Sequence, residues 1–133
     1  AEIDLQDSKG YTALMNAAQH GHELVVELLL QRGANVDLQS SDGFTALMGA
    51  AGKGHERVVE LLLRRGTDAN LQNSNGYTAL VFAAGKGYEQ ITRLLLQARA
   101  AVNQAQHDGA TPLFMACYQG HLECVRLLLE ASA

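Results

Sequence analysis

Apolar residues recur along this chain in short clusters separated by polar, glycine-containing segments. Val25, Leu28 and Leu29 have the spacing of one face of an α-helix, and Leu30 completes a leucine triplet. An earlier cluster combines leucine with a pair of alanines, at Leu14 and at 17–18. The pattern therefore predicts two short helices, the first with small residues that let a neighbour approach closely. We expect the apolar face of the second helix to pack against the next unit.

The whole pattern returns every 33 residues without an insertion. Such a fixed period indicates a repeat array. It predicts one domain over residues 1–133, with units at 7–39, 40–72, 73–105 and a shortened 106–133. Residues 1–6 match the unit end at 34–39, so we expect the chain to begin inside the tail of a preceding unit. The recurring positions include Gly10, Gly43, Gly76 and Gly109, and also Thr12, Thr45, Thr78 and Thr111.

Local signals place the elements within each unit. Pairs such as Asp42-Gly43 and Asn75-Gly76 favour a tight turn, which predicts a hairpin-like loop at the start of the unit. The threonine that follows is a suitable helix N-cap, and Pro112 stands at the first helical position. Because one unit cannot cover both of its faces, the units must stack. The sequence predicts an all-α helical solenoid with two antiparallel helices and one hairpin-like loop per repeat.

Four segments of the first unit carry a family resemblance: Gly10-Tyr-Thr-Ala-Leu14, Ala17-Ala18-Gln-His-Gly-His22, Val25-Val-Glu-Leu-Leu-Leu30 and Gly33-Ala34. This pattern resembles the ankyrin repeat family, and the resemblance extends over the whole chain. It implies an ankyrin-type solenoid whose partners contact the loop tips and the exposed side of the first helices. The resemblance also likens Asn70 and Asn103 to asparagines that are hydroxylated in some ankyrin proteins.

Two departures from the family pattern generate expectations. The histidine of the family's Thr-Pro-Leu-His is replaced by apolar residues, which we expect to pack between units: Met15, Met48, Val81 and Phe114. Arg99 stands where Gly33 and Gly66 end the second helix. A non-glycine residue in a left-handed conformation costs on the order of 1 kcal/mol, so we expect the junction of units three and four to be weak.

Composition and charge narrow the function classes. Hydrophobic residues make up 47% and charged residues 18%, which fits a folded domain. The net charge of -4 disfavours nucleic acid as a partner, and the apolar runs are too short to span a membrane. The opening residues contain no basic segment followed by an apolar one, and we expect Cys117 and Cys124 to be buried reduced thiols. These features predict an intracellular protein, cytoplasmic or nuclear.

The sequence offers no arrangement of residues for catalysis, so we predict that the chain is not an enzyme and has no cofactor. Ala-Ala-Gly-Lys-Gly at 50–54 and 83–87 lacks the spacing of a phosphate-binding loop and closes a helix instead of opening one. His22, His55 and His121 recur at one position beside the turn between the helices, which indicates a structural role and no metal site.

The candidate partner-binding residues fall into three sets. The loop tips carry Lys9, Asp42, Asn75, His107 and Asp108. A ladder of aromatic residues follows the loops at Tyr11, Phe44 and Tyr77, with Phe82 close by. The ends of the first helices carry Gln19, His20, Lys53, Lys86, Tyr118 and Gln119. Lysines beside aromatic rings favour a protein or peptide partner that is acidic and has an apolar anchor. Rings packed over their own turns, with solvated lysines, are the simpler interpretation of the same residues.

The leading hypothesis is a protein-protein interaction module that binds its partner in the groove of loop tips and first helices. A structural spacer array in a larger protein is an alternative, and a designed or library-derived binder is another. Neither end of the chain has an obvious polar capping unit, because the last unit ends in Leu127-Leu-Leu-Glu-Ala-Ser-Ala133. We therefore also expect end-to-end self-association through the terminal repeats.

Overall fold

The computed structural model describes residues 2–132, and the terminal residues Ala1 and Ala133 of the predicted domain lie outside the described residues. Within residues 2–132 the chain forms eight helices and no strand, which confirms the all-α prediction. The helices form four consecutive pairs: α1 (Ala13–Gln19) and α2 (Glu23–Gln31), α3 (Ala46–Lys53) and α4 (Glu56–Arg64), α5 (Ala79–Lys86) and α6 (Glu89–Gln97), α7 (Pro112–Tyr118) and α8 (Leu122–Ser132).

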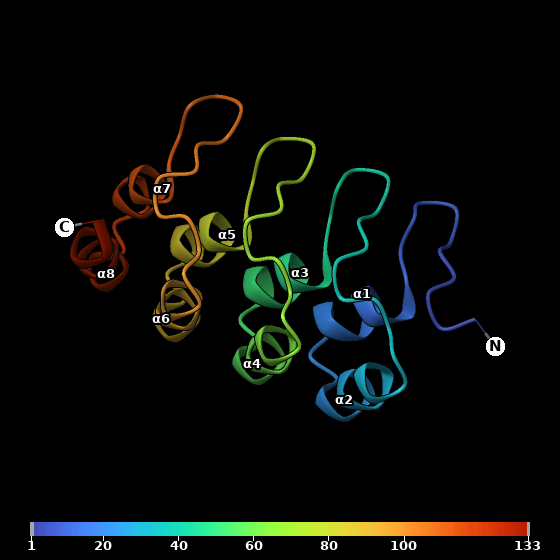
Figure 1. Ribbon diagram of the computed structural model, residues 1–133. Coiled ribbons are helices and arrows are strands. Elements are labelled where there is room, and N and C mark those ends of the chain that lie inside the picture. The colour runs from blue at the N-terminus through green and yellow to red at the C-terminus, as the bar shows by residue number, and fades with distance from the viewer. Residues whose placement is uncertain (1, 133) are drawn as a thin grey trace.

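The four units stand side by side, and their loops and helices form three tiers (Figure 1). The loops form one tier, α1, α3, α5 and α7 form the next, and α2, α4, α6 and α8 form the third. We call the second tier the inner helices and the third tier the outer helices. The two ends of the chain lie at opposite ends of the row, as expected for a helical solenoid.

Each inner helix begins at a threonine cap, as predicted. The hydroxyl oxygens accept hydrogen bonds of 3.2–3.3 Å from the backbone N–H three residues later, at Thr12, Thr45, Thr78 and Thr111. Pro112 follows the last of these caps at the start of α7. Helices α3 and α5 end at the left-handed glycines Gly54 and Gly87. Local residue chemistry thus sets both ends of these helices.

Alanine lines the contact between inner helices. Ala18, Ala50 and Ala84 have no exposed surface, and α1, α3, α5 and α7 pack in that order. Leucines seal the space between the inner and outer tiers, and Leu62 and Leu95 are fully buried. Each such leucine contributes about 1.5–3 kcal/mol through removal of its side chain from water.

The apolar face of the outer helices packs in the direction opposite to the one predicted. Val58 and Leu61 of α4 are 0% and 8% exposed, whereas their equivalents Val25 and Leu28 of α2 are 49% and 50% exposed. Helix α4 packs against α2 of the preceding unit. Helix α2 belongs to the first described helix pair, so no described helix pair precedes it. This face therefore packs against the preceding unit, and the prediction that it meets the next unit was wrong.

The last unit also departs from two expectations. Met15, Met48 and Val81 are buried as predicted, but Phe114 at the equivalent position is 56% exposed. Cys117 is exposed, although Cys124 is buried. Both exposed residues lie on α7, and no later helix pair within residues 2–132 covers it. Burial raises the pKa of the Cys124 thiol, which lies 3.6 Å from Thr92 Oγ1.

Hydrogen bonds hold neighbouring loops in register. Gly43 N–H donates to the Ser40 carbonyl at 2.9 Å and closes the turn, whose positive φ of 81° suits glycine. Ser41 N–H donates to the Lys9 carbonyl of the preceding loop at 2.9 Å. The Gln39 amide donates both to its own loop and across to the next. The loops therefore form a continuous row rather than separate hairpins.

Arg99 adopts the strained conformation that its position predicts. Its φ of 65° is the one positive value at a non-glycine residue between positions 2 and 132. Gly66 has a φ of 77° at the equivalent position of the preceding unit. The end of α6 therefore stores backbone strain that the end of α4 avoids.

Replacing Arg99 with glycine should stabilise the protein. We expect Arg99→Gly to raise the free energy of unfolding by up to about 1 kcal/mol, measured by chemical denaturation. Gly66→Arg is the matched control and should lower it, because a Cβ at Gly66 has no neighbour within 4 Å and introduces only backbone strain. An unchanged or lower denaturation midpoint for Arg99→Gly would contradict the assignment of strain.

Candidate functional site

An aromatic cluster runs along the boundary between the loops and the inner helices. The rings of Tyr11 and Phe44 stack with centroids 6.3 Å apart. Phe82 of α5 meets Phe44 edge-on at 6.0 Å and Tyr77 at 5.3 Å. The predicted ladder is therefore continuous, but Phe82 bridges Phe44 and Tyr77. All four residues are half-buried, so part of each remains accessible to a partner.

The inner helices carry positive charge in a chain whose net charge is -4. Their charged residues are Lys53 and Lys86, both exposed, and none of the four helices contains Asp or Glu. The ion pairs in the described part of the chain, Arg57 with Glu60 and Arg126 with Glu123, lie on outer helices. Neither lysine is neutralised by an ion pair there, so both ammonium groups can interact with a partner.

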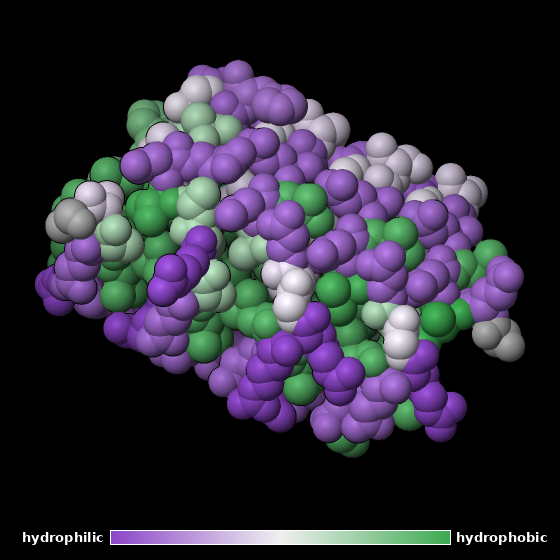
Figure 2. All heavy atoms as spheres, viewed as in Figure 1, coloured by the Kyte–Doolittle hydropathy of each residue, from purple (hydrophilic) through white to green (hydrophobic). Residues whose placement is uncertain are grey.

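The loop tips form a polar rim above this surface. Lys9, Asp42, Asn75, His107 and Asp108 are all exposed. Figure 2 shows mainly hydrophilic residues along the upper edge, where the loops lie. Such a rim suits hydrogen bonding around an apolar contact.

A carboxylate stabilises the turn of the first loop. The Asp7 carboxylate accepts hydrogen bonds of 2.9 Å from the backbone N–H groups of Tyr11 and Lys9, which lower the pKa of Asp7. Burial raises the pKa of the Tyr11 hydroxyl, and the nearby charge of Asp42 raises it further. Lys9, Tyr11 and Asp42 also line a hollow of about 390 Å³ between the first two loops.

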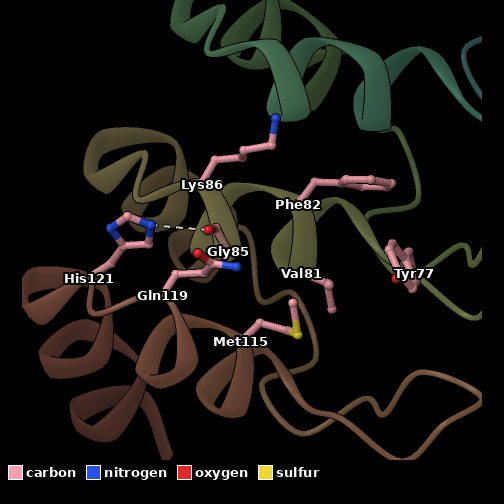
Figure 3. Close-up of a pocket in the computed structure, with 8 residues that line it drawn as sticks. All are labelled: Tyr77, Val81, Phe82, Gly85, Lys86, Met115, Gln119 and His121. Carbon is pink, nitrogen blue, oxygen red and sulfur yellow. Dashed lines mark hydrogen bonds between the residues drawn. The ribbon is translucent and has the colours of Figure 1, made fainter.

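A larger hollow of about 440 Å³ lies between α5 and α7 (Figure 3). Four of the predicted site residues line it: Tyr77, Phe82, Lys86 and Gln119. The other lining residues were not among the candidate partner-binding residues: Val81, Gly85, Met115 and His121. Glycine at 85 replaces Gln19 of the first unit and Tyr118 of the last, but Gly52 holds the same position in the second unit, where Phe82 lies against it. The sequence alone therefore does not locate the hollow.

The remaining predicted residues lie outside these two hollows. Gln19 is half-buried at the end of α1, and His20 next to it is exposed with its Nδ1 2.8 Å from the Asn16 carbonyl. Tyr118 is 75% exposed and stacks on Phe114 at the end of the row. The structure therefore gathers the central part of the predicted surface and leaves its two ends more open.

Two of the three recurring histidines, His55 and His121, connect neighbouring units, whereas His22 is exposed. Nε2 of His55 lies 2.9 Å from the Gln19 carbonyl, and Nε2 of His121 lies 3.1 Å from the Gly85 carbonyl. Because a carbonyl can only accept, Nε2 carries the proton in both cases. In the range 2–132 no three His, Cys, Asp or Glu side chains come together as a metal site. The two hydrogen bonds make His55 and His121 structural links between units.

A family model described as ankyrin repeats in three copies matches residues 1–73 and again residues 47–133. Together the two matches cover the chain. The chain belongs to the ankyrin repeat family. Ankyrin repeats are generally protein-interaction modules, and the family is generally non-enzymatic. A search of curated proteins returned no match to this ankyrin repeat chain. Across residues 2–132, the helices are too short or too polar to cross a bilayer.

The structural role of the histidines can be tested by comparing two equivalent positions. His55→Ala removes the hydrogen bond to Gln19 and should lower the free energy of unfolding by about 1 kcal/mol or more, measured by chemical denaturation. His22→Ala is the control, because His22 is exposed and should change stability by less than about 0.5 kcal/mol. Equal losses in both variants would argue against the link.

Proposed function

We propose that this ankyrin repeat chain holds a partner protein or peptide in the groove formed by its loop tips and inner helices. The observation that carries the proposal is the composition of the inner helices. They present aromatic, glycine and lysine residues to the groove and contain no carboxylate. A surface of this kind favours an acidic partner with an apolar anchor.

The physical roles of the groove residues differ. Phe44, Phe82 and Tyr77 are rigid and already in contact with one another, so a partner that packs on them orders few additional side-chain rotamers. Lys53 and Lys86 attract carboxylates and disfavour basic partners. The exposed loop tips supply polar contacts at the edge.

Charge reversal in the groove tests this function. Lys53→Glu combined with Lys86→Glu and Phe44→Ala should remove partners that the whole chain captures from a cell extract, identified by mass spectrometry. The expected loss is at least about ten-fold, because like charges now face the partner and an aromatic anchor is absent.

A matched control makes the test specific. Arg64→Glu with Arg93→Glu makes the same change of charge on α4 and α6, where both arginines are exposed on outer helices. The control should retain the partners, and circular dichroism should show equal helicity in all variants. Equal capture by the groove variant, or equal loss in the control, would contradict binding through the groove.

We also propose that copies of this chain associate end to end. Val25 and Leu28 are exposed at one end, and Phe114, Tyr118 and Leu129 are exposed at the other. Figure 2 shows hydrophobic residues gathered at the end of the molecule where α7 and α8 lie. The two ends correspond to the two sides of the seam between units, so one end complements the other. Contacts of this head-to-tail type extend into open chains of molecules instead of closed dimers.

Association should depend on concentration and on these apolar ends. In sedimentation velocity experiments, the mean sedimentation coefficient should rise with protein concentration. Leu28→Glu should suppress this rise by placing a charge in the contact, whereas Gln31→Glu on an exposed position of the same helix should not. A constant coefficient for the unmodified chain would contradict end-to-end association.

A further inference from the structure

The hollow between α5 and α7 exists because a side chain is missing from its wall. Gly85 occupies the position of Gln19 in the first unit and of Tyr118 in the last. A Cβ built on Gly85 would have the Met115 Cβ, 3.7 Å away, as its nearest neighbour. The resulting volume of about 440 Å³ lies within the range of about 300–1,000 Å³ that is typical of ligand pockets.

The walls of this pocket are apolar and partly adaptable. Val81 is buried beneath it, and Phe82 and Tyr77 form an aromatic side with ring centroids 5.3 Å apart. Met115 lies on the other side in Figure 3, and its flexible thioether can adjust to the shape of an occupant. His121 turns its Nε2 toward the Gly85 carbonyl, 3.1 Å away. These surfaces favour a bulky apolar side chain over a polar one.

A single positive charge stands at the edge of the pocket. The Lys86 stem contributes to the lining, while its ammonium extends away from Met115 toward the preceding unit (Figure 3). Lys86 is exposed, and no ion pair to it occurs within residues 2–132. An occupant with a carboxylate beside its apolar group would therefore satisfy both features. In an extended segment, side chains two residues apart point to the same side, which matches this arrangement.

From these observations we infer that the pocket between α5 and α7 receives a bulky apolar side chain of a peptide segment, while a carboxylate of the same segment pairs with Lys86. The inference rests on the proposed function. It adds the place where the partner's anchor is held, the size class of that anchor and the position of the accompanying charge.

Methyl NMR provides a direct test, because the chain has three methionines in different surroundings. The probe is a short synthetic Gly-Ser peptide with a central phenylalanine and a glutamate two residues to either side. The peptide is added to protein labelled with ¹³C at the methionine methyl groups. The chemical shift of the Met115 methyl group should change with peptide concentration until it reaches a plateau. Met15 and Met48 are buried, 2% and 1% exposed, and should not move. Peptides with alanine for phenylalanine, or lysine for glutamate, should bind at least about ten-fold more weakly.

Variants of the pocket complete the test. Gly85→Tyr introduces the residue that the last unit has at Tyr118, and it should fill the pocket and abolish the Met115 shift. Gly85→Gln introduces the smaller residue that the first unit has at Gln19, and it should fill the pocket less completely. Gln31→Tyr places the same side chain at an exposed position of α2, which does not line the pocket, and should retain binding. Lys86→Gln should weaken binding of the glutamate peptide and leave that of an uncharged analogue unchanged. Thermal unfolding verifies that each variant is folded.

Several results would overturn the inference: no shift of Met115, equal binding of the alanine peptide, or equal loss in Gln31→Tyr and Gly85→Tyr. A Met115 shift that follows protein concentration without peptide would assign the pocket to a second copy of the chain. If the peptide fails while the variant with Lys53→Glu, Lys86→Glu and Phe44→Ala still loses the captured partners, the pocket assignment falls and the groove function stands. If both fail, the proposed function falls as well.

Discussion

Close packing between neighbouring inner helices is the contact on which the remaining structure depends. Ala18, Ala51 and Ala84 have no exposed surface, and their small side chains allow the helix backbones to approach. The approach brings the end of one inner helix within reach of the next unit, where His55 bonds to the Gln19 carbonyl. It also sets the spacing at which one loop can bond to the next. Larger side chains at the alanine positions would separate all of these contacts at once.

Because each unit contacts mainly its neighbours, local features have local consequences. The strain at Arg99 lies at the junction that follows α6, and the exposed Phe114 marks the face of α7 that lacks a neighbour among the described helices. Stability in such an array is a sum of units and seams rather than the property of one central core.

The same packing leaves one side of every inner helix free to vary. Position 82 holds phenylalanine while its equivalents are Asn16, Gly49 and Met115. The variation places an aromatic bridge and a hollow beside each other, with Lys86 at the edge. A constant scaffold thus presents a particular surface, which is consistent with the general use of ankyrin repeats in protein interaction.

The sequence by itself determined the period, the helix pairs, the threonine caps and the left-handed position of Arg99. These features depend on residues within a few positions of one another, where spacing and backbone preference suffice. The tertiary structure alone decided the direction in which Val25 and Leu28 face, the exposure of Phe114 and Cys117, and the bridge that Phe82 makes. It also decided the hollow above Gly85. Each of these features depends on which residue of the neighbouring unit packs against the residue in question. That packing partner is about one repeat away in the chain, or there is no described unit to supply it.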